Sequence, residues 1–218
     1  RRTAPPTLQN AALLALRDFL AARDERQTVI AGYPWFLDWG RDTLICVRGL
    51  IAAGFTDEAG AILCQFAELE RDGTLPNMLQ GGDLHNRDTS DAPLWLIVAC
   101  ADYCRAADGR KLLETACGRR PLRQVLQAIV EGYSRGTPNG IRLDPRSGLI
   151  FSPAHFTWMD TNHPAGSPRE GYPIEIQALW VAALSFLAGL DKRPGPWPDL
   201  ARRARESIRR YYWLDDAG

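Results

Sequence analysis

An Arg-Asp pair beside several aromatic residues is the densest group of chemically useful side chains in the sequence. It occurs in GYPWFLDWGRDT, residues 32–43, where Trp39, Arg41 and Asp42 stand directly before an apolar helical pattern. Aromatic faces pack against the C–H sides of sugar rings, and charged side chains make bidentate hydrogen bonds to neighbouring hydroxyls. The segment fits a carbohydrate site. It fits equally well a helix N-terminus that Asp42 caps beside a buried aromatic cluster.

A second polar group follows the first along the chain. It contains Asn77 in the string LPN, and Asp91 and Trp95 in the string SDAPLW, residues 90–95. We expect Ser90 or Asp91 to cap the helix that begins here, with Trp95 one turn further along. Capping uses one carboxylate, so the other acidic residues of this loop either bind a ligand or are simply solvated.

A third group combines acidic and aromatic residues near the end of the longest loop. Asp160 ends the string TWMD, directly after Trp158 and Met159, and PREGYPIEIQALW, residues 168–180, contains Arg169 and Glu175. An aspartic acid beside apolar neighbours suits a general acid, whereas Glu175 in the first turn of a helix is placed to remain ionised. Glycoside hydrolysis uses two carboxyl groups in such contrasting settings, although a chain of this size contains similar pairs by chance.

Helices must position these residues. Apolar spacing of three and four residues predicts helices over 7–24, 42–53, 56–71, 90–107, 110–135, 172–190 and 197–213. The convincing strand signal is one hairpin at 141–143 and 149–151, so we expect an all-α fold. The segments 25–41, 72–89 and 136–171 are long loops, which tend to be functional. We expect them to meet at one end of the fold.

Composition excludes several classes of partner. We expect the 218 residues to form a single domain over 1–218. The chain carries 26 basic and 26 acidic side chains, so its charge does not favour binding to nucleic acid or to an anionic membrane. Without a membrane span or an apolar leader, we expect a cytoplasmic protein. The five cysteines predict reduced thiols. Cys100 and Cys104 lack a second pair of metal ligands, so we expect no metal and no other cofactor.

The five strings GYPWFLDWGRDT, LPN, SDAPLWL, TWMD and PREGYPIEIQALW together resemble, in order and spacing, the amylo-α-1,6-glucosidase domain of archaeal and bacterial glycogen-debranching enzymes. The likeness runs from about residue 7 to the end of the sequence. It implies an (α/α)6 toroid of helical hairpins, similar to glucoamylases, of which about seven of the twelve helices are present here. It also implies glucose release from glycogen or another branched α-glucan, with inversion at the anomeric carbon.

The resemblance also implies roles for individual residues. Asp160 matches the general acid, and Arg41 with Asp42 matches the pair that grips hydroxyls of the terminal glucose. Other substrate contacts are implied for Trp39, Asn77, Asp91, Trp95, Trp158, Arg169 and Glu175.

The sequence departs from this family in what it lacks. The β-rich domain that precedes the barrel, the remaining helices and the carboxylate expected to act as catalytic base are not in it, so we expect an incomplete barrel. One hypothesis is therefore a glycoside hydrolase whose base comes from sequence not present here. The alternative is a non-catalytic glucan-binding remnant. Metal-dependent chemistry on a similar toroid is disfavoured because a Cys/His ligand set is missing.

Overall fold

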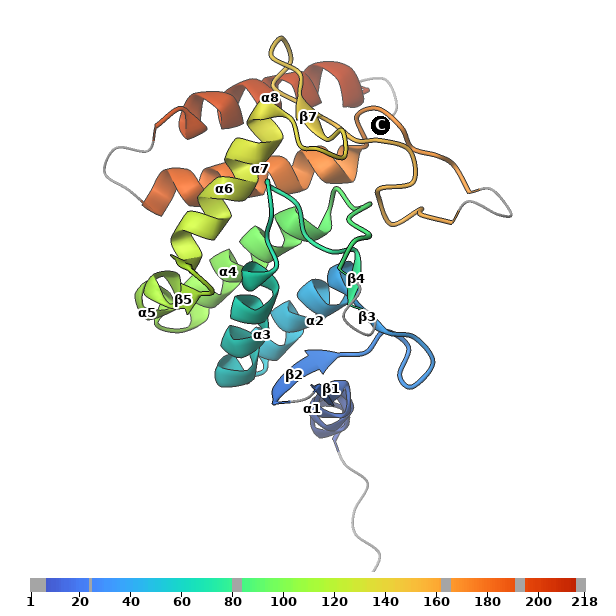
Figure 1. Cartoon of the computed structure of the whole chain (residues 1–218), viewed down its shortest axis with the longest axis vertical. Helices are drawn as coiled ribbons and strands as arrows, with labels where there is room; N and C mark the ends of the chain where they lie inside the picture. The colour runs from blue at the N-terminus through green and yellow to red at the C-terminus, as the bar shows by residue number, and fades with distance from the viewer. Residues whose placement is uncertain (1–6, 24, 80–83, 162–165, 191–194, 215–218) are drawn as a thin grey trace, which may run out of the picture.

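Helices dominate the part of the chain that the computed structural model describes, which is residues 7–23, 25–79, 84–161, 166–190 and 195–214 (Figure 1). The helices are α1 (Leu8–Asp18), α2 (Gly40–Ala52), α3 (Thr56–Glu68), α4 (Ala92–Ala106), α5 (Gly109–Glu114), α6 (Leu122–Arg135), α7 (Ile174–Leu190) and α8 (Trp197–Tyr212). With strands limited to short pairs, the fold is all-α, as the apolar spacing predicted, and it is built from helical hairpins, as the family resemblance implied.

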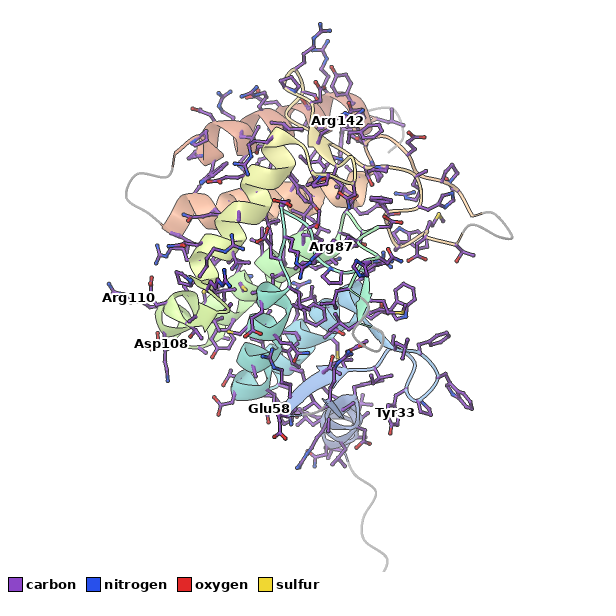
Figure 2. The ribbon with its side chains drawn as sticks, viewed as in Figure 1. Tyr33, Glu58, Arg87, Asp108, Arg110 and Arg142 are labelled. Carbon is purple, nitrogen blue, oxygen red and sulfur yellow. The ribbon has the colours of Figure 1, made fainter. Side chains whose placement is uncertain are left out.

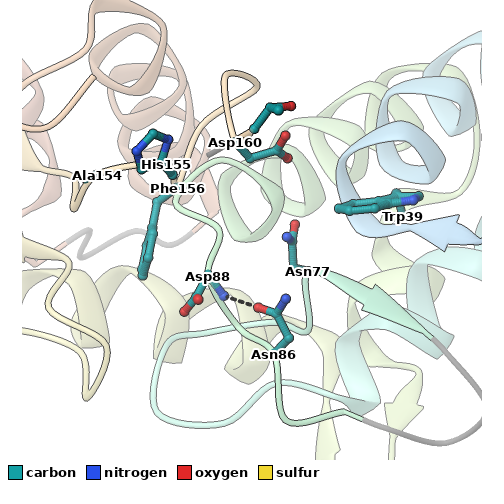
Figure 3. A pocket seen from close by; sticks show the side chains of 9 residues that line it. Trp39, Asn77, Asn86, Asp88, Ala154, His155, Phe156 and Asp160 are labelled. Atoms are coloured by element: carbon teal, nitrogen blue, oxygen red, sulfur yellow. Dashed lines mark hydrogen bonds between the residues drawn. The ribbon is translucent and has the colours of Figure 1, made fainter. Parts of the chain in front are cut away.

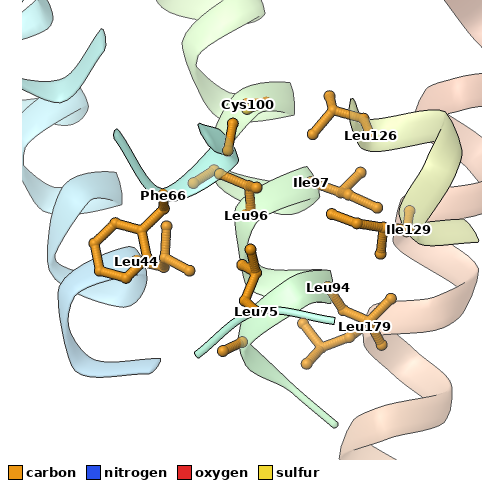
Figure 4. Close-up of a cluster of buried hydrophobic side chains, with 14 of the residues drawn as sticks. Leu44, Phe66, Leu75, Leu94, Leu96, Ile97, Cys100, Leu126, Ile129 and Leu179 are labelled. Carbon is orange, nitrogen blue, oxygen red and sulfur yellow. The ribbon is translucent and has the colours of Figure 1, made fainter. Parts of the chain in front are cut away.

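Helix α4 lies at the centre of the hydrophobic core. It contacts α2, α3, α5, α6 and α7, and Leu94, Leu96, Ile97 and Cys100 are fully buried among them (Figure 4). Apolar residues occur on all sides of α4, as expected for a helix with neighbours all round. The N-terminal end of α4 is therefore fixed in position by the core of the protein.

Two helix pairs flank α4. The pair α2 and α3 is joined by a short turn, in which Gly54 adopts a left-handed backbone with φ of +87°. The pair α7 and α8 packs on the other side, at the top of Figure 1. Helix α8 buries Leu200, Ala201 and Ala204 against its neighbours and turns its arginines to solvent, which is the pattern of a surface helix.

Short strand pairs fasten the long loops to each other and to the helices. The pairs are β1 (Leu20–Arg23) with β2 (Arg26–Val29), β3 (Asp38–Trp39) with β4 (Met78–Leu79), β5 (Ala116–Cys117) with β6 (Arg120–Pro121), and β7 (Arg142–Leu143) with β8 (Ile150–Phe151). The predicted hairpin at 141–151 is confirmed as β7 and β8. The pair β3–β4 joins two of the long loops directly.

Two predicted helices were too long. The segment 110–135 forms α5 and α6 separately, because Gly118 takes φ of +65° in the β5–β6 turn and Pro121 has no N–H to donate. The segment 7–24 ends as a helix at Asp18, and the chain then pairs β1 with β2, which buries Thr28 and Val29 against α2 and α3. Local turn residues therefore divide the first segment, whereas tertiary packing overrides the helical spacing in the second.

A half-buried arginine anchors the loop that follows α3. Arg87, near the middle of Figure 2, donates to the carbonyl oxygens of Leu69 at 2.7 Å and Thr74 at 3.2 Å. This loop therefore has a fixed position beside the end of α3.

Over the residues described, no helix has the length and apolar character needed to cross a bilayer.

Candidate active site

The three long loops meet at one cavity of about 340 Å³, which is within the usual range for small-ligand sites (Figure 3). Its wall combines two aromatic rings, two amides, two carboxyl groups and an imidazole. The lining residues are Trp39, Asn77, Asn86, Asp88, Ala154, His155, Phe156, Asp160 and Thr161. The expectation that the long loops come together is thus confirmed.

Backbone hydrogen bonds place Trp39 and Asn77 in this wall. Trp39 pairs with Met78 across β3–β4, and the N–H of Gly40 donates to the carbonyl oxygen of Asn77 at 2.9 Å. The N–H of Asn77 donates in turn to the carbonyl oxygen of Asn86, also at 2.9 Å. These links hold the aromatic and amide side chains in fixed relation to the start of α2.

The opposite wall is fastened to α4 and α6 through Ser90. The N–H of Ser90 donates to the carbonyl oxygen of Phe156 at 2.7 Å, and its hydroxyl lies 2.8 Å from that of Ser152. The hydroxyl of the buried Tyr133 donates to the Ser90 carbonyl oxygen at 2.9 Å. The loop carrying the third group of candidate residues is therefore held against the N-terminal end of α4.

Arg41 connects the candidate residues of all three loops. Its Nε donates to Oδ2 of Asp91 at 2.5 Å, its Nη1 to Oδ2 of Asp160 at 3.1 Å, and its Nη2 to the carbonyl oxygen of Thr157 at 2.8 Å. The side chains of Arg41 and Asp91 are only 12% and 4% exposed, whereas that of Asp160 is 27% exposed. Burial acts to lower the pKa of Arg41, but the two carboxylates outweigh it and raise that pKa.

One of the two predicted helix caps is wrong, and the other is confirmed in position only. Helix α2 begins at Gly40, so Asp42 lies in its first turn and not at its N-cap. Asp91 occupies the N-cap of α4 without a side-chain capping bond. Instead Thr89 Oγ1 accepts from the N–H of Ala92 at 3.3 Å and donates to Asp91 Oδ1 at 2.8 Å. The Asp91 carboxylate is consequently free of capping and pairs with Arg41.

Asp42 itself lies close to this ion-pair network. Burial raises the pKa of Asp42, and the Arg41 guanidinium partly offsets that effect. Its direct contact with a sugar hydroxyl stays a prediction.

Besides Arg41, Asp42 and Asp91, four more residues predicted to contact substrate lie outside the lining of this cavity, namely Trp95, Trp158, Arg169 and Glu175. Arg169 makes a two-point ion pair with Glu175, in which Nε lies 2.9 Å from Oε1 and Nη2 reaches Oε2. The Arg169 guanidinium lies 5.9 Å from the ring centre of Trp158, which is 55% exposed. Trp95 packs against the core under Arg48. Substrate contacts by these four residues remain predictions.

The cavity contains residues that sequence reasoning did not select. Asn86 and Asp88 belong to a loop whose excess of polar groups was visible, and Asn86 Oδ1 accepts from the Asp88 N–H at 3.0 Å (Figure 3). His155 gave no such signal. It adopts φ of +62°, which few residues other than glycine adopt, so its sequence neighbours do not predict its orientation.

Two buried polar atoms of lining residues have no hydrogen-bond partner among the described atoms. They are Oδ1 of Asn77 and Nδ1 of His155. Such atoms are rare in folded proteins, and each calls for an explanation. Within the described residues, no group of three His, Cys, Asp or Glu side chains is placed to hold a metal ion. The cavity therefore offers unpaired polar atoms to a ligand that forms hydrogen bonds.

Comparison with known proteins agrees with this chemistry. A family model described as amylo-alpha-1,6-glucosidase matches residues 14–217. The chain is also similar to the glycogen debranching enzyme of Saccharomyces cerevisiae (strain ATCC 204508 / S288c), with 28% identity over 225 aligned positions. That alignment covers 76% of this chain but only 15% of the yeast enzyme.

Proposed function

Because the chain belongs to the amylo-alpha-1,6-glucosidase family, we propose that its cavity binds the terminal glucosyl unit of a branched α-glucan and that Asp160 is the general acid for its release. The observation that carries this proposal is the meeting of Trp39, Asn77 and Asp160, from three separate loops, in the wall of one cavity. The family resemblance implied substrate contacts for Trp39 and Asn77 and the role of general acid for Asp160.

The chemistry of the wall supports a sugar over other ligands. The Trp39 ring offers an apolar face, while the unpaired Asn77 Oδ1 accepts a hydrogen bond and therefore favours a hydroxyl donor. Asp88 and Asp160 disfavour an anion. The balanced charge of the whole chain, 26 basic against 26 acidic residues, also argues against nucleic acid as a partner.

The contacts of Asp160 suggest how it acts. Arg41 holds Oδ2, so the carboxyl group is oriented and Oδ1 is the oxygen that would carry the proton to the glycosidic oxygen. Inversion, which we also propose, needs a second carboxylate about 6.5–9.5 Å away to activate water. We assign that role to none of the described carboxylates.

Two wider proposals follow from family membership. We propose that the helical hairpins form part of an (α/α)6 toroid, with residues 1–218 belonging to one domain. We also propose that the substrate is glycogen or a similar branched α-glucan in the cytoplasm. The name of the yeast relative, glycogen debranching enzyme, supports a role in debranching, but the chain matches only 15% of that enzyme.

One observation favours a second function, which is glucan binding without hydrolysis. Asp160 accepts a hydrogen bond from Arg41, and a carboxylate that serves only as a counter-ion has no proton to donate. On this alternative, Trp39 and Asn77 would still bind a sugar, but no bond would be cleaved.

Glucose release from branched dextrin and from α-glucosyl fluoride tests the proposal. Asp160→Asn keeps the size of the side chain but removes its acid proton, so turnover of dextrin should fall by about 10²–10⁴-fold. Fluoride needs little protonation to depart, so its hydrolysis should be less affected. Asp144→Asn, in the β7–β8 turn and outside the cavity lining, is the matched control and should behave as the unaltered chain does.

The other outcomes separate the alternatives. Sugar binding without any glucose release by the unaltered chain would favour the binding function. Equal losses on the two substrates, or normal turnover of dextrin by Asp160→Asn, would remove Asp160 from the role of general acid. Absence of sugar binding would refute both functions.

A further inference from the structure

His155 is held in a strained backbone conformation at the edge of the cavity. Its φ of +62° lies in the left-handed region, which a histidine adopts only when its surroundings enforce it. Its N–H donates to the carbonyl oxygen of Pro168 at 2.8 Å, and its neighbour Phe156 is held through the Ser90 N–H at 2.7 Å. Strained residues of this kind cluster at functional sites, where they direct a side chain.

The imidazole that this conformation directs to the cavity is incompletely satisfied. Nδ1 of His155 is buried and has no partner among the described atoms, although His155 lines the cavity. An unpaired buried polar atom costs free energy, which a ligand recovers when it supplies the missing partner. A sugar hydroxyl can do so whichever imidazole nitrogen carries the proton, because a hydroxyl both donates and accepts.

The position of His155 relative to Asp160 indicates which sugar it would meet. In Figure 3, Trp39 lies on one side of Asp160, and His155 with Phe156 lies on the other. A general acid must lie at the bond that it helps to break, with one sugar on each side. If the departing glucose occupies the side of Trp39 and Asn77, the remaining glucan occupies the side of His155.

We propose that His155 and Phe156 bind the sugar to which the departing glucose is linked. This inference rests on the proposed function, and it adds the part of the site that recognises the branched chain. His155 supplies a hydrogen bond to one hydroxyl of that sugar, and the Phe156 ring supplies an apolar face. The pair would therefore affect disaccharides and longer glucans but not free glucose.

The test compares the binding of glucose and isomaltose by titration calorimetry. His155→Gly removes the imidazole and also relieves the backbone strain, since glycine readily adopts a positive φ. It should lower isomaltose affinity by roughly tenfold, the effect of losing one hydrogen bond, and should leave glucose affinity unchanged. His155→Asn keeps a polar group and tolerates this backbone, so it should restore part of the isomaltose affinity.

Asp72→Gly is the matched control, because Asp72 also has a positive φ, of 51°, and lies outside the cavity lining. It should change neither affinity, and circular dichroism checks that each variant folds. Equal weakening of both sugars by His155→Gly, or no weakening of either, would overturn the assignment of His155. Failure of the unaltered chain to bind either sugar would instead refute the proposed function, and this inference with it.

Discussion

Replacement of Arg41 by alanine is the perturbation that most directly probes how the three loops are held together. Arg41 donates to Asp91, Asp160 and the Thr157 carbonyl oxygen, and these partners lie 50, 119 and 116 residues away in the sequence. The variant would leave the Asp91 carboxylate, 4% exposed, without its counter-ion. We therefore expect Arg41→Ala to destabilise the fold as well as the site.

The magnitude follows from the burial of the two carboxylates. Loss of one partner from a buried ion pair typically costs about 3–5 kcal/mol. Two features reduce the cost of losing Arg41. Asp91 keeps its hydrogen bond from Thr89 at 2.8 Å, and Asp160 is 27% exposed and can be hydrated. We expect the free energy of unfolding to fall by about 2–4 kcal/mol. Sugar affinity measured on the folded fraction should also fall.

Urea unfolding followed by circular dichroism measures this loss, and Arg48→Ala is the control. Arg48 also lies on α2 and pairs with an α4 residue, Asp102, but its side chain is 40% exposed, and Asp102, which is 17% exposed, has a second ion pair with Arg105. Loss of an ion pair with one exposed partner, when the other partner keeps a counter-ion, should cost about 0–1 kcal/mol. Equal destabilisation by the two substitutions, or a loss below about 1 kcal/mol for Arg41→Ala, would refute the argument from burial.

Two further predictions concern packing and thiol chemistry. Gly132→Ala on α6 would place a Cβ 2.6 Å from the Cα of Gly73, so it should lower the free energy of unfolding by about 1–3 kcal/mol or more. At Gly189 on α7 an added Cβ meets no atom within 4 Å, so Gly189→Ala should raise the free energy of unfolding by about 0.5–1 kcal/mol. Thermal unfolding of the two variants checks this, and similar melting temperatures would contradict it. A hydrogen bond with Cys117 lowers the pKa of Cys64, so more Cys64 is thiolate at pH 7.5 than in an ordinary thiol. Cys117→Ala should slow alkylation of Cys64 by iodoacetamide and move its pH profile upward, and an unchanged rate would contradict the contact.

Local patterns predicted the helices well where packing and propensity agree. The spacing of apolar residues located α2, α3, α4, α7 and α8 to within a few residues. It failed at β5–β6, where Gly118 and Pro121 break the helical pattern, and at β1–β2, where a tertiary contact competes with it. The turn at Gly118 carried a local signal, but the pairing of Leu20–Arg23 with Arg26–Val29 depends on the helices on which it packs.

The site shows the same division between local and long-range information. Motifs identified Trp39, Asn77 and Asp160, which the structure places in one cavity wall. The sharing of Arg41 between two carboxylates could not be predicted, because it depends on how distant loops pack. The position of His155 in the cavity wall could not be predicted either, because its left-handed backbone is imposed by residues that are its neighbours in space.

A crystal structure of the chain soaked in isomaltose would test the central claim, that the cavity around Asp160 is a glucosyl site. We expect the non-reducing glucose to lie against Trp39 with a hydroxyl donating to Asn77 Oδ1. The glycosidic oxygen should lie within about 2.6–3.2 Å of a carboxyl oxygen of Asp160. Isomaltose bound elsewhere on the protein while this cavity holds only water would contradict the claim.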